Sequence, residues 1–387
     1  MRRGWELAIH HLTPEEFPRT CLILNEGIEQ GIAPGMVAGF WTAREPDRVR
    51  LRASGVRRTH STLALPMTVE TVFDLASVSK VFATATLAAL FVERGWISWE
   101  TPVCAVLPSF EYPEIRIRHL LAHTSGLPAW VPLFEKIRAH FSRRPVESFS
   151  VSSRQRLMRN LVFTISPEKP AGERAVYSDI GFIVLGFLLE EIAGSALDRA
   201  VANFLWKPMG LNSAFYNRIT TSPSRDVRHE VAATEDCPWR GGILQGQVHD
   251  DNCWSMGGYA GHAGAFANAK DVLGFAAGLM SGFLSKEVMA AVWERVERPL
   301  GCERTLGWDT PSGPEPSAGK FFSERSVGHL GFTGTSLWID PQAELAVTLL
   351  TNRVHPSREN TKIKAFRPRF HDAIRQDIDS LPSSKRH

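Results

Sequence analysis

The periodicity of apolar and polar residues divides the chain into strand-like ends and a helical middle. GMVAGFWTA and RVRLRASGV near the N-terminus are short apolar or β-branched runs, which predict strands. HLGFTGTSLWID and ELAVTLLTN have the same character near the C-terminus. The stretch from about Ser79 to about Arg295 is mostly helical in pattern, with loops that carry proline and glycine.

Helices are also predicted close to both ends of the chain. For residues 12–31, Thr13 is a plausible N-cap, Pro14 fits the first helical position, and Gly31 ends the helix. TKIKAFRPRFHDAIRQDI predicts a closing helix.

Strands at both ends with helices between them predict a discontinuous α/β (α+β) architecture. We expect residues 1–78 and 260–387 to form a sheet-containing α/β domain, and residues 79–259 to form an inserted, mostly helical domain. An active-site cleft is expected between the two domains. The length of 387 residues agrees with two domains of the usual ~150 residues.

Composition is that of an ordinary globular protein, with 43% hydrophobic and 22% charged residues. The formal net charge of +3 gives no support to a nucleic-acid partner. The longest apolar stretches, VFATATLAALFV and IGFIVLGFLL, are too short to span a bilayer and predict core helices.

Cysteine usage and the N-terminus bear on the compartment. Five scattered cysteines without a C-x-x-C pair make a disulfide framework improbable and favour a reducing environment. The N-terminal MRRGWELAIHHLTPEEF begins basic but lacks the apolar core of a signal peptide. We therefore expect a cytoplasmic protein.

The pattern S-x-x-K occurs at Ser77, Ser166 and Ser317, and only Ser77 stands at the start of a long helix. Because residues i and i+3 share a helix face, Lys80 can reach the Ser77 hydroxyl. The helix N-terminus favours an oxyanion at Ser77. Burial should lower the pKa of Lys80, so that this side chain accepts a proton near neutral pH. The alternative is a capping serine followed by a surface lysine.

Two later segments carry further candidates. Tyr177, in VYSDIGF, precedes a buried helix, and a tyrosine near Lys80 could pass a proton to a leaving group. GHLGFTGTSLWID predicts a strand whose glycines let a substrate carbonyl approach a backbone N–H. Taken singly, each segment also fits a purely structural reading: a half-buried tyrosine with a satisfied hydroxyl, and a turn-rich strand end.

The segments FDLASVSK, LLAHTSGLP, YSDIGF, GHAGAF and GHLGFTGTSLWIDP follow one another in this order. With them the chain resembles, over nearly its whole length, the serine β-lactamase and penicillin-binding-protein superfamily, and within it the class C β-lactamase-like group. That group includes β-lactamases, D-Ala-D-Ala peptidases, D-aminopeptidases and esterases. The resemblance implies a β-lactamase/transpeptidase-like fold, in which helices flank an antiparallel sheet and a helical domain is inserted.

The resemblance also implies roles for individual residues. Ser77 would be the acylated nucleophile and Lys80 its general-base partner, with no cofactor. Tyr177 would be the tyrosine of the family's Tyr-x-Asn motif. The asparagine position, which the resemblance places among the substrate-binding residues, holds Asp179. This residue keeps hydrogen-bonding capacity but changes the charge.

The family's Lys-Thr-Gly strand motif falls on His329, Leu330 and Gly331, and the oxyanion hole would use the backbone N–H groups of Ser77 and Phe332. A histidine is only partly charged at neutral pH, and leucine has no hydroxyl. A substrate carboxylate should therefore be held less well than in the family, and a neutral ester or amide should lose little.

Other chemistries are less well supported. His249, Asp250 and Asp251 are adjacent and could suggest a metal, but H-E-x-x-H is absent, and we expect no metal site. Neither G-x-G-x-x-G nor a Walker A motif is present, and no G-x-S-x-G elbow occurs. His123 is expected to be a structural histidine.

The predicted function is a serine hydrolase that acts through an acyl-enzyme on a small-molecule ester, amide or peptide. One alternative is a β-lactamase or a D-Ala-D-Ala carboxypeptidase. A second is a non-catalytic binding or scaffolding relative, which the departures at Asp179, His329 and Leu330 motivate.

Overall fold

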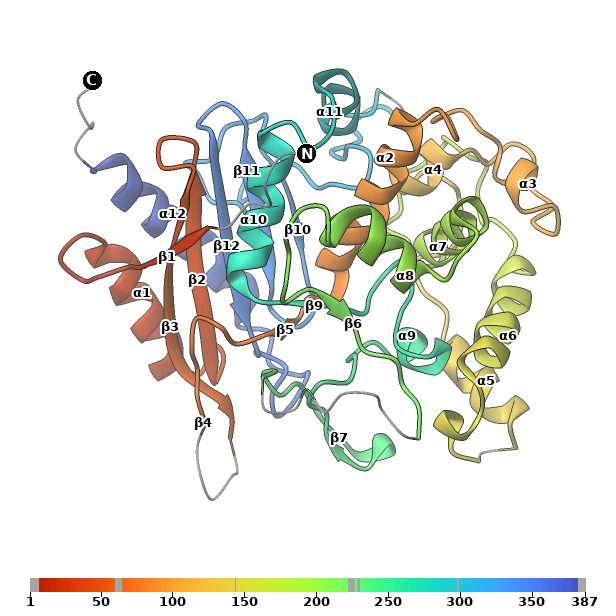
Figure 1. The fold of residues 1–387 in the computed structure, drawn as a ribbon, viewed down its shortest axis with the longest axis horizontal. Helices are drawn as coiled ribbons and strands as arrows, with labels where there is room; N and C mark the ends of the chain where they lie inside the picture. Colours follow the sequence, from red (N-terminus) through yellow and green to blue (C-terminus); the bar gives the residue numbers. More distant parts are fainter. Residues whose placement is uncertain are drawn as a thin grey trace.

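The computed structural model describes residues 7–59, 65–142, 144–221, 227, 230–297 and 299–381. Residues 1–6, on which part of the expectation about a signal peptide rests, lie outside the described residues. Figure 1 shows a large sheet with helices on both faces and a group of helices beside it. The fold is thus the mixed α/β arrangement expected from the sequence.

The largest sheet is built from both ends of the chain. Its spatial order is β1 (Ala8–His11), β3 (Arg48–Arg58), β2 (Gly35–Thr42), β12 (Leu345–Thr351), β11 (Ser336–Asp340) and β10 (Val327–Leu330), and β4 (Leu65–Pro66) also pairs with β3. All pairings are antiparallel except that of β1 with β3, which is parallel. The sequence did not predict β1, and β10 ends the path at the sheet edge.

Successive side chains of β2 point to opposite faces of the sheet, and each face is covered by its own helices. Met36, Ala38 and Phe40 of β2 pack into a core cluster with α1 (Pro18–Glu29) and α12 (Ile363–Asp379). The intervening Val37 belongs to the larger core cluster, on the face where α10 (Ala269–Met280) packs. In Figure 1, α1 and α12 lie on one side of the sheet and α10 on the other.

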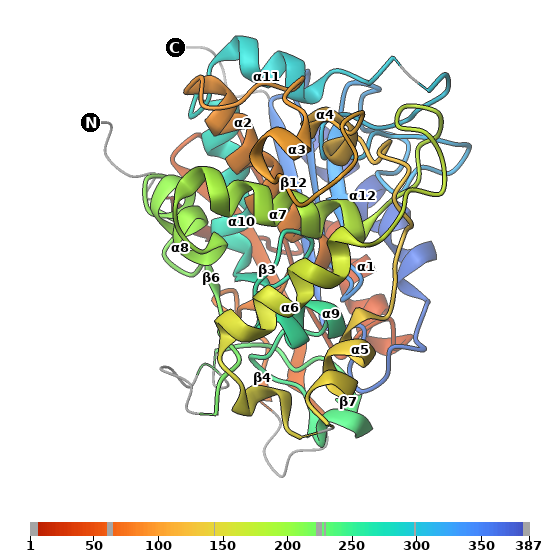
Figure 2. The ribbon, with the colours of Figure 1, turned by 90° about the vertical axis from the view of Figure 1, so that its right-hand side faces the viewer.

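The middle of the chain supplies most of the remaining helices, which face the viewer in Figure 2. They are α2 (Thr86–Glu93), α3 (Val103–Val106), α4 (Ile117–Leu121), α5 (Leu133–His140), α6 (Val151–Phe163), α7 (Asp179–Ala193), α8 (Leu197–Val201), α9 (Asp251–Met256) and α11 (Lys286–Trp293). Two small sheets join β5 (Phe73–Asp74), β9 (Ala265–Ala267) and β6 (Phe215–Tyr216), and β7 (Asp236–Cys237) with β8 (Gly242–Ile243).

One continuous core joins the two expected domains. The larger cluster contains Leu7 and Leu350 from the ends of the chain together with Phe82, Phe182 and Trp206 from its middle. The proposed boundaries at residues 78/79 and 259/260, and the cleft between the two parts, stay a prediction.

Two helix starts differ from the sequence-based expectation. The first helix begins at Pro18 rather than Pro14, because residues 14–16 form a turn, and no side chain caps it. The Ser77 segment is not a plain α-helix. A 3₁₀ turn, Ala76–Val78, leads into a π-helical stretch, Lys80–Ala85, before α2. A π-helical turn of this kind is frequent at functional sites.

One described helical stretch, Ala76–Glu93, is by length and composition apolar enough to cross a membrane. Within the fold, however, 83% of that window is buried. A core helix of this kind passes the same test.

Two helical glycines offer a matched test of how closely the helices pack. A Cβ on Gly186 of α7 would lie 2.9 Å from the Gly261 nitrogen. One on Gly274 of α10 would meet two side-chain methyl groups at ordinary contact distances, Leu211 Cδ2 at 3.4 Å and Leu7 Cδ1 at 3.6 Å. We expect Gly186→Ala to destabilise the protein by about 1–3 kcal/mol through overpacking. Gly274→Ala should be neutral or stabilising by up to about 1 kcal/mol, because alanine favours the helix.

Chemical denaturation of the two variants and the parent chain measures both changes. Equal stability of the two variants would contradict the close approach of α7 to the Gly261 segment.

Candidate active site

Ser77 is presented by a strained turn that its neighbours hold in place. Ala76, directly before it, has a φ of +48°, an uncommon conformation for a residue with a side chain. The Ala76 N–H donates to Asp74 Oδ1 at 2.9 Å, and the His249 N–H donates to Asp74 Oδ2 at 2.6 Å. Asp74 is buried, which raises the pKa of its carboxyl group despite these two hydrogen bonds. The turn leaves Ser77 partly exposed.

Lys80 is fully buried one helical turn after Ser77, with a relative exposure of 0%. Its Nζ donates to Ser77 Oγ at 3.2 Å, to Asp179 Oδ1 at 2.7 Å and to the His262 carbonyl at 3.0 Å. The expected contact between Ser77 and Lys80 is therefore present. These three acceptors account for all three N–H donors of an ammonium group.

The expectation of a lowered lysine pKa was wrong. Burial lowers the pKa of Lys80, but attraction to the Asp179 carboxylate and to Tyr177 outweighs it, and the net direction is upward. Desolvation alone would lower the pKa, but the ion pair with Asp179 reverses the direction of the shift. In the resting site Lys80 is an ammonium that donates to Ser77.

Tyr177 lies where three parts of the site meet. The Lys80 Nζ is 4.8 Å from the centroid of the Tyr177 ring, and both Lys80 and Ser77 are near enough to the Tyr177 hydroxyl to influence its pKa. On the other side, the His123 ring packs against it with centroids 4.6 Å apart. Burial raises the pKa of Tyr177 more than Lys80 lowers it, so the phenol carries its proton. This arrangement can deliver a proton to a group that leaves the carbonyl carbon bonded to Ser77 Oγ.

His123 supports Tyr177 from behind. It has a φ of +59°, its Nδ1 accepts the Ser178 N–H at 3.0 Å, and burial holds the pKa of its imidazole well below the usual range. It makes these contacts as a neutral ring, which agrees with the structural role expected for it.

The two backbone amides expected to form the oxyanion hole have no acceptor within the described residues. In the described part of the chain, the N–H groups of Ser77 and Phe332 donate no hydrogen bond to another protein group. Thr333 Oγ1 donates to the Asp74 carbonyl at 2.8 Å, and Thr335 Oγ1 to the Leu75 carbonyl at 2.9 Å. The turn after β10 is thus fastened to the segment that carries Ser77.

Gly331 is required at this junction. A Cβ there would lie 2.0 Å from Thr335 Oγ1 and 2.5 Å from the Leu75 carbonyl oxygen. Any side chain at this position would separate the strand from the Ser77 turn. The resemblance placed the glycine of the strand motif here, and the packing gives that assignment a physical reason.

His329 reaches the site from β10 as a neutral acceptor. Burial and the neighbouring Lys80 lower the pKa of its imidazole to about 3. Its Nδ1 lies 2.9 Å from the Leu330 carbonyl and therefore carries the hydrogen, while its buried Nε2 has no partner in the described residues. The partial charge expected for His329 at neutral pH is thus absent. Leu330 packs toward the α1–α12 cluster.

The three residues considered for a metal have other partners. His249 contacts Glu235 at 3.1 Å, Asp250 contacts the His262 ring at 2.8 Å and caps α9, and Asp251 pairs with Arg240. Within the described ranges, no group of His, Cys, Asp and Glu side chains could hold a metal ion. Asp250 instead steadies His262, whose carbonyl oxygen accepts from Lys80.

Two groups that contact Lys80 or Tyr177 were not predicted from the sequence, the His262 carbonyl and the Arg304 guanidinium. The His262 carbonyl carries no residue-specific signal, because any backbone could supply it. Arg304 lies in a loop without a recognisable motif or periodicity. Its guanidinium nevertheless is 5.1 Å from the Tyr177 ring centroid and pairs with Asp309. The sequence shows Arg304 only as a basic residue upstream of the strand motif, which does not identify it as part of the site.

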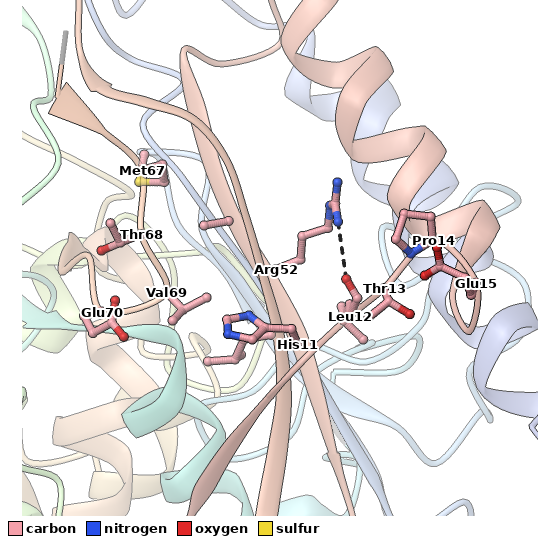
Figure 3. A pocket seen from close by; sticks show the side chains of 12 residues that line it. His11, Leu12, Thr13, Pro14, Glu15, Arg52, Met67, Thr68, Val69 and Glu70 are labelled. Atoms are coloured by element: carbon pink, nitrogen blue, oxygen red, sulfur yellow. Dashed lines mark hydrogen bonds between the residues drawn. The ribbon is translucent and has the colours of Figure 1, made fainter.

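The serines of the other two S-x-x-K patterns have contacts of a different kind from those of Ser77. Ser166 contacts the Tyr112 hydroxyl at 3.3 Å, and the Ser317 carbonyl faces the His371 ring. Figure 3 shows a pocket of about 560 Å³ between β1, β3 and the Met67–Glu70 segment. None of its lining residues belongs to the cluster around Ser77.

The fold, with a lysine and a tyrosine gathered around one serine, is that of a serine hydrolase of the β-lactamase type. The model of the family described as Beta-lactamase matches residues 23–367, and the chain belongs to this family.

A protein named "Putative D-alanyl-D-alanine carboxypeptidase" from Salmonella agona (strain SL483) is 28% identical over 329 residues, which cover 76% of this chain and 72% of that protein.

Solved structures of similar fold include "EstCE1, a hydrolase with promiscuous acyltransferase activity", with a TM-score of 0.71 and 22% identity over 93% of this chain and 99% of that chain. Simvastatin synthase (LovD) from Aspergillus terreus, unliganded, matches with a TM-score of 0.70 and 17% identity over 94% of this chain and 98% of that chain. The octameric penicillin-binding protein homologue from Pyrococcus abyssi matches with a TM-score of 0.67 and 20% identity over 90% of this chain and 76% of that chain.

The neutral state of His329 can be tested directly. We expect its imidazole to keep the Nδ1–H tautomer throughout the range from about pH 8 down to about pH 5, because burial and Lys80 disfavour a second proton. ¹H–¹⁵N correlation of the ring nitrogens measures this, with the signal assigned by its loss in His329→Asn. A titration midpoint in that range would contradict the assignment.

Proposed function

We propose that Ser77 is the nucleophile of this hydrolase and that an uncharged carboxylic ester or amide is its substrate. The observation that carries the proposal is the 3.2 Å contact between Lys80 Nζ and Ser77 Oγ on a lysine that is wholly buried. A surface lysine beside a capping serine would not be desolvated in this way. A non-catalytic scaffold has no need to bury an ammonium beside a strained serine turn.

Each group has a distinct part in the proposed reaction. Ser77 Oγ attacks the carbonyl carbon, and the amides of Ser77 and Phe332 receive the developing oxyanion. Lys80 and Tyr177 move protons, and Tyr177 protonates the leaving group. Water then enters by the same route and releases the acid from the acyl-enzyme. The proposal requires no cofactor.

The charge of the site supports an uncharged substrate. Where the family's strand motif has a lysine, His329 presents a lone pair on Nε2 instead of an ammonium. A lone pair accepts hydrogen bonds and repels a carboxylate. Phe332, which is 51% exposed, adds an apolar surface beside the oxyanion amides. An ester with an apolar acyl or alcohol part suits these groups.

A D-Ala-D-Ala carboxypeptidase is the second candidate. The curated relatives carry that name, and the Arg304 guanidinium near Tyr177 is a cation that a peptide carboxylate could approach. The pairing of Arg304 with Asp309 weighs against this candidate, since the local charge is already balanced. A cytoplasmic location is part of the proposal, and the free state of all five cysteines supports it.

Serine reactivity gives the first test. A fluorophosphonate should modify Ser77 alone, and Ser77→Ala should lower ester hydrolysis by about 10³-fold or more while the protein still folds. Ser166→Ala and Ser317→Ala are matched controls, because both serines begin an S-x-x-K pattern outside the site. They should keep full labelling and turnover. Intact mass and peptide mapping locate the adduct, and labelling that survives in Ser77→Ala would remove Ser77 from the mechanism.

Comparison with penicillin tests the substrate charge. We expect acylation of Ser77 by a fluorophosphonate and by p-nitrophenyl esters. Acylation by benzylpenicillin should be far slower, because His329 presents a lone pair to its carboxylate where the family has a lysine. Mass spectrometry over time measures both reactions on the same protein. Rapid acylation by both reagents would favour β-lactamase or D-Ala-D-Ala peptidase chemistry instead.

A further inference from the structure

The Lys80–Asp179 pair raises the question of where the Ser77 proton goes. A base must have a free lone pair, and a lysine whose three N–H bonds are all donated has none. Lys80 donates to Ser77, Asp179 and the His262 carbonyl. It can accept the Ser77 proton only if one of its own protons departs.

Of the three acceptors, only one can take that proton. The His262 carbonyl is not a base near neutral pH, and Ser77 is the group to be deprotonated. Asp179 Oδ1 lies 2.7 Å from Lys80 Nζ, the shortest of the three distances. A carboxylate at this position can bind a proton, which the amide of the family's asparagine cannot do.

We propose that Asp179 is the terminal proton acceptor of a relay that runs from Ser77 through Lys80. This inference rests on the proposed role of Ser77 as nucleophile. It assigns to Asp179 a chemical function in place of the substrate-binding one that the resemblance implied.

The steps balance in protons and electrons. As Ser77 Oγ forms its bond to the carbonyl carbon, its O–H proton moves to Lys80 Nζ, and an N–H proton of Lys80 moves to Asp179 Oδ1. The π electrons of the carbonyl pass to its oxygen. When the intermediate collapses, the leaving group takes the proton of Tyr177. Lys80 then reprotonates Tyr177, and Asp179 returns its proton to Lys80.

The position of Asp179 suits a group that must gain and lose a proton. It is the first residue of α7, its N–H donates to the Ala129 carbonyl at 2.8 Å, and its side chain is 18% exposed. The helix N-terminus stabilises the carboxylate in the resting state. Limited solvent access keeps the pair with Lys80 unscreened.

Other groups around the pair were considered as acceptors. The titratable and charged side chains that face Lys80 or Asp179 are Ser77, Tyr177, His123, His329, Asp250, Cys253 and Asp309, with Arg304 next to them. None of these carboxylates contacts Lys80 directly. Asp250 is bound to the His262 ring, and Asp309 to Arg304.

The pH dependence of ester hydrolysis separates the relay from a lysine acting alone. In the relay, Lys80 need not lose a proton before the reaction, so the acid limb of the pH profile of kcat/KM does not report the ionisation of the lysine. Asp179→Asn leaves Lys80 as the base, and the lysine must first lose a proton. The acid limb of the kcat/KM profile should therefore move to higher pH by about two units or more. If lysine acts alone, the opposite follows, because loss of the carboxylate lowers the pKa of Lys80 and moves the limb downward.

The experiment uses p-nitrophenyl butyrate, whose leaving group needs no proton from Tyr177. Asp179→Asn should fall to about 1% of the parent activity or less at pH 6 and recover toward alkaline pH. Asp250→Asn is the matched control. It removes a nearby charge, while the asparagine side chain still accepts the Cys253 N–H and caps α9. The acid limb of kcat/KM of this variant should move by less than about one pH unit. An unchanged or downward-shifted limb in Asp179→Asn would overturn the relay.

A measurement on the parent chain needs no variant and covers a failure of Asp179→Asn to fold. In mixtures of H₂O and D₂O, two protons in flight give a curved dependence of kcat/KM on deuterium fraction, and a single transfer gives a straight line. A straight line would overturn the relay. Failure of the proposed function is distinguishable, since the fluorophosphonate would then not label Ser77 and Ser77→Ala would retain hydrolysis.

Discussion

The buried ammonium of Lys80 is the interaction on which the arrangement of the site depends. Removing such a charge from water is unfavourable by several kcal/mol unless every donor finds an acceptor. The three acceptors come from the Ser77 turn, the start of α7 and the loop before β9. Misplacement of any one of these segments would leave a buried donor unsatisfied. The requirement to neutralise one side chain therefore fixes the relative positions of three distant stretches of chain.

The same segments are fixed independently by close backbone contacts. Gly186 and Gly261 let α7 approach the loop that supplies the His262 carbonyl. The Thr333 and Thr335 hydroxyls fasten the end of β10 to the residues before Ser77. Since the larger core cluster also continues from the sheet into the helical part, the site lies within one packed unit. Rigidity of this kind suits oxyanion stabilisation, which needs donors that do not reorganise during the reaction.

The sequence predicted the parts of this protein that local patterns encode. Alternating and helical periodicities located most strands and helices, and the structure places Ser77, Lys80, Tyr177 and Gly331, which the family resemblance named, close to one another. It did not give the sign of the Lys80 pKa shift, because that sign depends on a carboxylate 99 residues away. It also could not reveal the π-helical turn after Ser79 or the parallel strand β1, which tertiary hydrogen bonds determine. Pro14 and Pro18 are both plausible helix starts, and packing selected the second.

Phe332 contributes to the proposed oxyanion hole through its amide and not through its ring. Arg353 Nε donates to the Phe332 carbonyl at 2.8 Å, and its guanidinium lies 4.4 Å from the ring centroid. The arginine thus holds the peptide group in place, while the ring is half exposed and rests on the Arg353 guanidinium and the His249 ring. Natural selection is therefore free to exchange residue 332 for a different side chain without disturbing the amide. New acyl-group preferences could evolve there while the reaction itself is retained.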